Sequence, residues 1–192
     1  MLIQTCRPSS RLSTCPNIYL SGQSLKYVDK FKYLGHYITE MFTDDMDIGR
    51  EIKSMYARGN MLIRNLNFLP IDTKCALFKT YCYQMYTSSL WSRYNQSSLR
   101  RLRVCYNSIM RRLAGVPPWH SARSMFVRMG VQHFDETYRH ACYSMICRLA
   151  ESPNHIIGTL ISCDTHILSS QYERWRNILL TPGSANDGLA GE

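Results

Sequence analysis

The stretch DIGREIKSMYARGNMLIRNL, residues 47–66, decides the fold class because its apolar and small residues recur at intervals of three and four. The positions of this stripe are Ile48, Ile52, Met55, Gly59, Leu62, Ile63 and Leu66. Side chains at this spacing lie on one face of an α-helix, where they can pack against a core. The sequence therefore predicts an amphipathic helix that is closed by Pro70.

Helical periodicity continues along the rest of the chain. The further helices that it predicts span residues 71–91, 95–115, 121–129, 135–149 and 168–180. Asp72 and Thr73 are the expected caps of the first of these helices. Gly115, with two prolines just beyond it, is expected to end the second, and Gly130 the third.

The segment before residue 40 has a strand-like pattern instead. NIYLSG and QSLKYV flank a Ser-Gly turn, and KFKYLGHYIT follows with closely spaced aromatic and apolar residues. The predicted fold is mainly α, a helical bundle preceded by a small antiparallel β-hairpin element. We expect a β element over residues 1–40, an α-helical domain over 41–180 and a disordered tail over 181–192.

Two adjacent aspartates in FTDDM, residues 42–46, resemble the way in which polymerases present metal-binding carboxylates. Catalytic aspartates of that kind lie at a turn between apolar strands, whereas Asp44, Asp45 and Asp47 precede a stretch with helical periodicity. Acidic residues at a helix start accept hydrogen bonds from free N–H groups and suit the helix dipole. We therefore interpret these aspartates as capping residues of the helix, not as a catalytic box.

The net charge of +9 is unevenly distributed along the sequence. No acidic residue lies between Asp72 and Asp135. The basic residues of that interval are Lys74, Lys79, Arg93, Arg100, Arg101, Arg103, Arg111, Arg112, Arg123 and Arg128. A long segment of one sign favours a phosphate backbone as the partner, over a solvated face without a partner or, for residues 99–113, an anionic membrane surface.

Cysteine spacing and hydropathy indicate an intracellular, soluble protein of the nucleus or cytoplasm. No apolar run approaches the length needed to cross a bilayer. Five of the eight cysteines fall inside predicted helices, where reduced thiols behave as small buried apolar groups. These are Cys75, Cys82, Cys105, Cys142 and Cys147. The pairs Cys142–Cys147 and Cys163–His166 do not match zinc-ligand spacing, so no metal site is expected.

Aromatic residues at helical spacing lie close to the basic residues. Such residues are usually part of a core, although rings near cations can also stack on bases. We expect Tyr81 to be a core residue and leave both interpretations open for Trp91 and Tyr94.

Several segments in a fixed order resemble the reverse transcriptases of non-LTR (LINE-type) retrotransposons, in the part that follows the catalytic palm. They are YVDKFKYLGHYIT, DDMDIGREIKSMYARGNMLIRN, KCALFKTYCYQMYTSSLW, LRRLRVCYNSIMRRLAGVP and SARSMFVRMGV. The resemblance runs from about residue 18 to residue 149, which is most of the chain.

The resemblance implies a division of labour within the chain. Residues 31–38, with Tyr33, Leu34 and Gly35 at their centre, would match the primer-grip hairpin, where the glycine would permit close backbone approach. The helices after Asp44 would match the thumb and the segment that follows it, which track the template–primer hybrid. The implied phosphate contacts are Arg100, Arg101, Arg103, Arg111 and Arg112, with Lys79 and Arg93 as further candidates.

The chain also departs from the family pattern. In the family, an aromatic-x-D-D box and another aspartate precede the strand that YLG matches, and neither is present after Met1. We therefore expect no catalytic residues, no polymerase activity and no cofactor, although the family uses Mg²⁺. The expected function is a nucleic-acid-binding fragment that contacts an RNA–DNA hybrid or another nucleic acid.

The alternative function is a helical scaffold or protein-interaction module, or a retroelement relic without present function. Such a chain should expose an apolar surface within residues 19–37, where the missing palm domain or another protein would pack.

Overall fold

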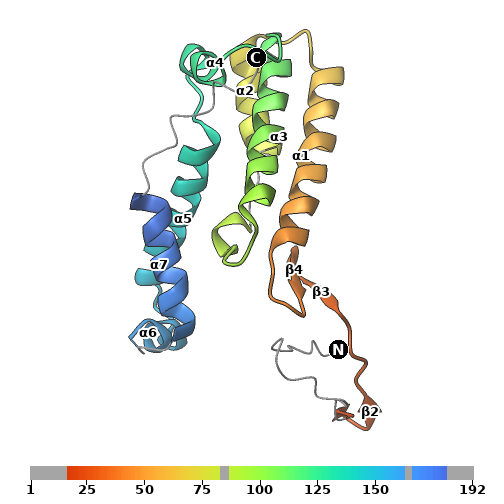
Figure 1. The fold of residues 1–192 in the computed structure, drawn as a ribbon, viewed down its shortest axis with the longest axis vertical. Helices are drawn as coiled ribbons and strands as arrows, with labels where there is room; N and C mark the ends of the chain where they lie inside the picture. The colour runs from red at the N-terminus through yellow and green to blue at the C-terminus, as the bar shows by residue number, and fades with distance from the viewer. Residues whose placement is uncertain (1–16, 83–86, 163–165, 181–192) are drawn as a thin grey trace.

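The computed structural model describes residues 17–82, 87–162 and 166–180. Within these ranges it is mainly α, with two small hairpins that precede a bundle of helices (Figure 1). Strands β1 (Tyr19–Leu20) and β2 (Gln23–Ser24) pair antiparallel around the predicted Ser-Gly turn. The predicted fold class is confirmed; the predicted disordered tail, residues 181–192, lies outside the described residues.

The second hairpin is formed by β3 (Lys30–Tyr33) and β4 (His36–Thr39), paired antiparallel from Lys30 and Thr39 to Tyr33 and His36. Its turn consists of Leu34 and Gly35, which have φ angles of 47° and 85°. Positive φ at both central residues belongs to the hairpin turn whose twist matches the strands. A Cβ on Gly35 would meet nothing within 4 Å, so among the described residues the glycine serves this turn conformation. The close backbone approach to a primer that the resemblance implies stays a prediction.

Helix α1 (Asp45–Asn65) buries the predicted stripe against α3 (Gln96–Ala114). Ile48, Met55 and Leu62 are buried, and the backbone of Gly59 lies against Ile109 of α3. A Cβ on this glycine would lie 2.7 Å from Cγ2 of the isoleucine, so the close approach of the two helices depends on its absence.

The prediction of one continuous α-helix over residues 71–91 is wrong. The structure has α2 (Ile71–Leu77), a π-helical turn η1 (Phe78–Cys82) and, after residues 83–86, a 3₁₀ turn η2 (Ser88–Leu90). Asp72 and Thr73 are not its caps either, because α2 begins at Ile71 with Pro70 in the N-cap position. Proline is suited to a helix start, where its missing N–H costs nothing.

The remaining helices are α4 (Ala122–Met129), α5 (Phe134–Ala150), α6 (His155–Ser162) and α7 (His166–Leu180). Gly115 and Gly130 end α3 and α4 in the left-handed conformation, as the sequence predicted. Helix α6 was not predicted from the sequence. Asn154 precedes it, and the side chain of this residue accepts a hydrogen bond from the Ile156 N–H at 2.9 Å.

Aromatic rings from four elements form the centre of the core. Tyr106 of α3 packs against Phe78, Phe126 and Phe134 at centroid distances of 5.4, 5.6 and 6.0 Å. The Trp175 indole N–H donates to the Ser89 carbonyl at 2.7 Å, which ties α7 to η2.

The cysteines agree with the predicted core thiols. Cys75, Cys82, Cys105 and Cys142 are buried free thiols, and Cys147 is half-buried. Burial raises the pKa of the Cys105 thiol to about 12, which keeps it protonated. None of the helices in the described ranges is long and apolar enough to span a membrane.

Candidate nucleic-acid interface

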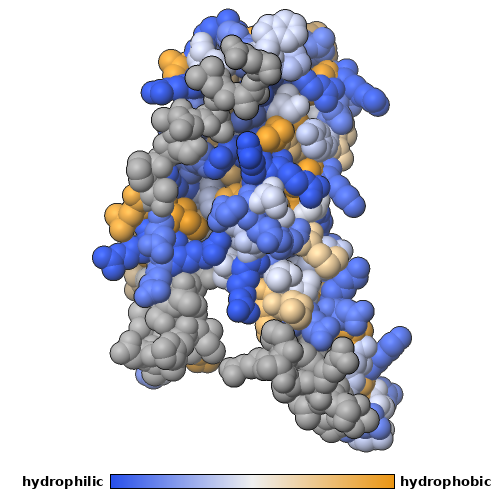
Figure 2. All heavy atoms as spheres, viewed as in Figure 1, coloured by the Kyte–Doolittle hydropathy of each residue, from blue (hydrophilic) through white to orange (hydrophobic). Residues whose placement is uncertain are grey.

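The predicted phosphate-binding arginines of α3 occupy two rows along the helix. Successive residues of an α-helix are rotated by about 100°, so Arg100 and Arg111 lie in one row and Arg101 and Arg112 in the next. Within each row the two residues are about 16 Å apart along the helix axis. The surface over α3 and α1 is mostly hydrophilic in Figure 2. Arg100 and Arg101 are exposed and have no carboxylate partner among the described residues.

Three of the five arginines already contact protein groups. Arg103 points away from both rows and forms an ion pair with Asp135 of α5, with Nη2 2.7 Å from Oδ1. Arg111 donates from Nε to the carbonyl of His120 at 3.1 Å, and Arg112 donates to Oδ1 of Asn60 at 2.6 Å. Arg112 remains exposed, so its bond to a neutral amide leaves its charge unneutralised.

Lys79 and Arg93 lie on other elements and do not extend the two rows. Lys79 is exposed on η1, and Arg93 is exposed in the loop before α3. The backbone of Arg93 is fixed in place by Asp44, because their main chains share a 2.7 Å hydrogen bond and the Arg93 N–H donates to Oδ2 of Asp44 at 2.8 Å.

The tip of the second hairpin is open to solvent. Tyr33 is 57% exposed and Leu34 is 73% exposed. Tyr19 and Leu20 of the first hairpin are exposed to a similar degree, so the predicted apolar surface within residues 19–37 is confirmed. Figure 1 places β3 and β4 beyond the N-terminal end of α1.

A buried carboxylate joins that hairpin to the helices. Asp47, which is fully buried, accepts hydrogen bonds at Oδ2 from Thr87 Oγ1 at 2.7 Å, Trp91 Nε1 at 2.9 Å and His36 Nδ1 at 3.1 Å. Arg50 Nε donates to its other oxygen at 2.8 Å. We call these five residues, together with Asp44, the carboxylate latch.

Asp44 completes the latch from the N-cap position of α1. Its Oδ2 accepts the backbone N–H groups of Ser92 and Arg93 at 2.7 and 2.8 Å, and its Oδ1 lies 3.3 Å from His36 Nε2. Asp45 likewise accepts from the Asn95 backbone at 3.0 Å. Asp44 does occupy the N-cap position, but the predicted capping hydrogen bonds are wrong. The side chains of Asp44 and Asp45 bind the loop before α3 and not the N–H groups of their own helix.

The latch changes the protonation of its members. Hydrogen bonds to Asp44 and Asp47 raise the pKa of His36 to about 9, despite the opposing effect of burial. Burial would raise the pKa of Asp47, but the donors His36, Arg50, Trp91 and Thr87 outweigh it and hold that pKa well below its usual range. Near neutral pH the hairpin is therefore held by a protonated imidazole between two carboxylates.

Glu51, one turn further along α1, is also buried. It contacts Arg58 at 2.9 Å and Arg50 at 3.3 Å, while burial raises its pKa. The carboxylates of Asp47 and Glu51 are thus turned inward and paired with cations. Asp45 instead accepts from the neutral amide groups of Asn95, which leave its charge unneutralised.

No protein-family model and no solved structure matches the chain. Two curated proteins described as RNA-directed DNA polymerase from mobile element jockey are similar to it. The one from Drosophila melanogaster is 22% identical over 157 residues, and the one from Drosophila funebris is 21% identical over 162 residues.

The chain is related to the reverse transcriptases of non-LTR retrotransposons. The similarity covers 79% of the chain but only 17% of each of these two relatives. The predicted resemblance is confirmed, and this reverse-transcriptase-related chain corresponds to about a sixth of the relatives' length.

The carboxylate latch was not predicted from the sequence. Thr87 and Trp91 lie 40 and 44 positions from Asp47, so no local pattern connects them. Trp91 proves to be a buried hydrogen-bond donor, and Tyr94 is half-buried with Arg174 4.1 Å above its ring. Tyr81, predicted to be a core residue, is 59% exposed, so that prediction is wrong.

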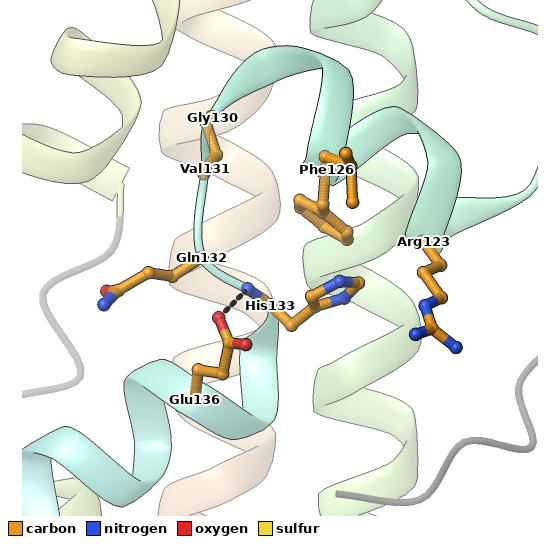
Figure 3. A pocket seen from close by; sticks show the side chains of 8 residues that line it. Arg123, Phe126, Gly130, Val131, Gln132, His133 and Glu136 are labelled. Carbon is orange, nitrogen blue, oxygen red and sulfur yellow. Dashed lines mark hydrogen bonds between the residues drawn. The ribbon is translucent and has the colours of Figure 1, made fainter.

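A hollow of about 400 Å³ lies between α4 and the start of α5 in the same chain (Figure 3). Arg123 and the ring of His133, which packs 4.6 Å from Phe126, border it. Glu136 accepts a hydrogen bond from the His133 N–H at 3.1 Å and so places a carboxylate beside the free end of α5. That carboxylate makes the hollow a poor site for phosphate.

Proposed function

We propose that the chain is a nucleic-acid-binding segment of a retrotransposon reverse transcriptase and that it contacts the backbone of an RNA–DNA template–primer. The observation that supports this best is the exposed face of α3, where Arg100, Arg101 and Arg112 lie in a part of the sequence without acidic residues. Contacts to phosphates depend on cation placement and not on base sequence, which suits a surface that follows a moving hybrid.

In this proposal the helices correspond to the thumb and the β3–β4 hairpin corresponds to the primer grip. The carboxylate latch supports the assignment because it fixes the hairpin to the start of α1 and to the loop that leads into α3. Tyr33 and Leu34 would then be presented to the primer terminus at a constant position relative to Arg100 and Arg101.

We further propose that the described segment contributes binding and not catalysis. Asp44 and Asp47 have their oxygens occupied by protein donors, which leaves no converging set of free oxygens for Mg²⁺. The purified chain, incubated with Mg²⁺, deoxynucleotides and a primed RNA, should give no primer extension above a matched blank preparation. Extension by the chain would contradict this part of the proposal.

The test of binding is a titration with a labelled blunt RNA–DNA hybrid at several salt concentrations. Each phosphate contact contributes a slope of roughly −0.9 in log affinity against log salt on duplex DNA, so losing Arg100 and Arg101 should reduce the slope by about two units. Arg176→Ala, an exposed arginine on α7, is the matched control and should leave the slope unchanged. Equal slopes for all three proteins would refute the proposal.

A second candidate function is protein binding through the hairpins, supported by the exposed apolar residues there. Tyr19, Leu20, Tyr33 and Leu34 are each more than half exposed, which is more apolar surface than such short strands need to leave open. The partner would be the palm domain of the same enzyme or another protein. Replacing Leu20 and Leu34 with Ser should then abolish capture of that partner while hybrid binding by α3 persists.

A further inference from the structure

Two aromatic side chains at one end of the bundle are almost completely exposed. Trp119 is 85% exposed and Phe68 is 81% exposed, the highest values among the large apolar residues that the structure describes. The other two tryptophans, Trp91 and Trp175, are 0% and 2% exposed. Leaving a whole indole and a whole phenyl ring in water is unfavourable, and it therefore suggests a ligand for them.

The loops that hold these rings lie at the same end of the bundle. Phe68 is in the α1–α2 connection and Trp119 is in the α3–α4 connection, and both connections lie at the end opposite the β3–β4 hairpin (Figure 1). The bond between Arg112 and Asn60, at 2.6 Å, joins the last turn of α3 to the C-terminal half of α1. Two well-anchored loops therefore present the rings.

Anchoring within each loop supports a defined position for each ring. Arg111 donates from Nε to the carbonyl of His120, next to Trp119, at 3.1 Å. The amide oxygen of Asn67, next to Phe68, accepts from Lys74 Nζ at 3.4 Å. These bonds hold the residue next to each ring, and an ordered loop loses less conformational freedom on binding than a mobile one.

Three cations lie on the helix ends that flank the two loops. Arg64 at the end of α1 and Arg112 at the end of α3 are exposed, and Lys74 lies in the first turns of α2. One acidic residue, Asp72, lies two positions before Lys74 in α2. We call Arg64, Phe68, Lys74, Arg112 and Trp119 the tip surface; it combines aromatic faces with positive charge.

We propose that the tip surface binds unpaired nucleotides, with bases stacking on Trp119 and Phe68 and phosphates contacting Arg64, Lys74 and Arg112. Aromatic faces interleaved with cations bind single strands without sequence preference, because every base has a π-face. The inference rests on the proposed hybrid binding by α3, since Arg112 belongs to both surfaces. The hybrid would lie along α3, and the single-stranded template would continue past the end of that helix, about 21 Å from Arg100 along the axis.

The intrinsic fluorescence of the protein offers a direct test, because Trp119 is the exposed tryptophan and the other two are buried. A short oligouridylate should quench the emission of Trp119 in a saturable and salt-dependent manner. Trp119→Phe should abolish the quenching, since Trp91 and Trp175 cannot be reached. Absence of quenching, quenching that ignores salt, or quenching that persists in this variant would each overturn the proposal.

A second experiment separates the tip surface from α3. An RNA–DNA hybrid with an unpaired RNA extension should bind about tenfold more weakly to the double variant Trp119→Ala/Phe68→Ala, whereas a blunt hybrid should bind within about twofold. Tyr143→Ala, which removes an aromatic ring 56% exposed on α5, is the matched control for both ligands. Equal weakening for the extended and blunt hybrids would overturn the tip proposal.

The two proposals fail in different ways. If the Arg100→Ala/Arg101→Ala variant still binds the blunt hybrid normally, hybrid binding by α3 is refuted. Oligouridylate should still quench Trp119 in that variant if the tip surface binds nucleotides. A blue shift of Trp119 emission that grows with protein concentration would assign the tip surface to a second copy of the chain, and would overturn nucleotide binding there.

Discussion

Replacing Asp47 with asparagine should destabilise the fold more than any other change of similar size at the start of α1. Asparagine keeps the shape of the side chain and one acceptor oxygen, but it loses the negative charge that pairs with Arg50 and His36. Its single oxygen also cannot accept from all four donors that now bind Asp47. Breaking a buried ion pair costs about 3–5 kcal/mol. Because the side chains of Arg50 and His36 are 29% and 18% exposed, water recovers part of this, and we expect about 2–4 kcal/mol.

The assay is urea denaturation followed by far-UV circular dichroism, with hydrogen exchange of the β4 amides as a local measurement. Asp72→Asn is the matched control, because Asp72 is exposed in the first turn of α2 and should change stability by less than about 0.5 kcal/mol. Exchange at β4 should accelerate in Asp47→Asn and not in the control. If the two variants unfold within about 1 kcal/mol of each other, the latch does not hold the hairpin.

Two further predictions concern pH and packing. Since the pKa of His36 is raised from 6.5 to about 9, its contribution to stability is complete below pH 6.5 and is lost as pH rises through about 9. His36→Gln should flatten this alkaline loss in urea titrations; an unchanged profile would contradict the assignment. Gly59→Ala should destabilise by about 1–3 kcal/mol despite the better helix propensity of alanine, because its Cβ would lie 2.7 Å from Ile109. Gly158→Ala, which meets nothing within 4 Å, should be neutral or stabilising in the same thermal melt.

Elements with local causes were predictable from the sequence. The stripe of α1 and the glycine that ends α3 depend on residues a few positions apart, so periodicity and C-cap chemistry suffice to find them. The hairpin turn at Ser21 and Gly22 was predicted for the same reason, whereas the hairpin around Leu34 and Gly35 was implied by the resemblance.

The break after α2 has a distant cause. The side chains of Thr87 and Trp91 both bind Asp47. In a regular helix over residues 71–91 their directions would be set by the helical repeat and not by the position of Asp47. A π-helical turn adds a residue to the repeat and so rotates whatever follows it. Tyr81, inside that turn, accordingly points to solvent instead of the core predicted from the α-helical period.

The candidate site was predictable in composition but not in arrangement. The sequence identified the arginines of α3, yet only the fold separates Arg103, paired with Asp135, from Arg100 and Arg101, which have no carboxylate partner among the described residues. The acids that precede the basic segment are equally important. Asp47 and Glu51 are buried and matched with His36, Arg50 and Arg58, so their negative charge is neutralised inside the fold.

This placement bears on the nucleic-acid hypothesis more directly than net charge does. Had Asp47 and Glu51 faced outward, they would have lain beside the arginines of α3, since the two helices pack against each other. A hybrid backbone would then have met both signs of charge. In the latch, Asp47 binds the hairpin through His36, and Asp44 binds the loop before α3. The same contacts therefore position the hairpin and keep these two negative charges off the surface beside the arginines.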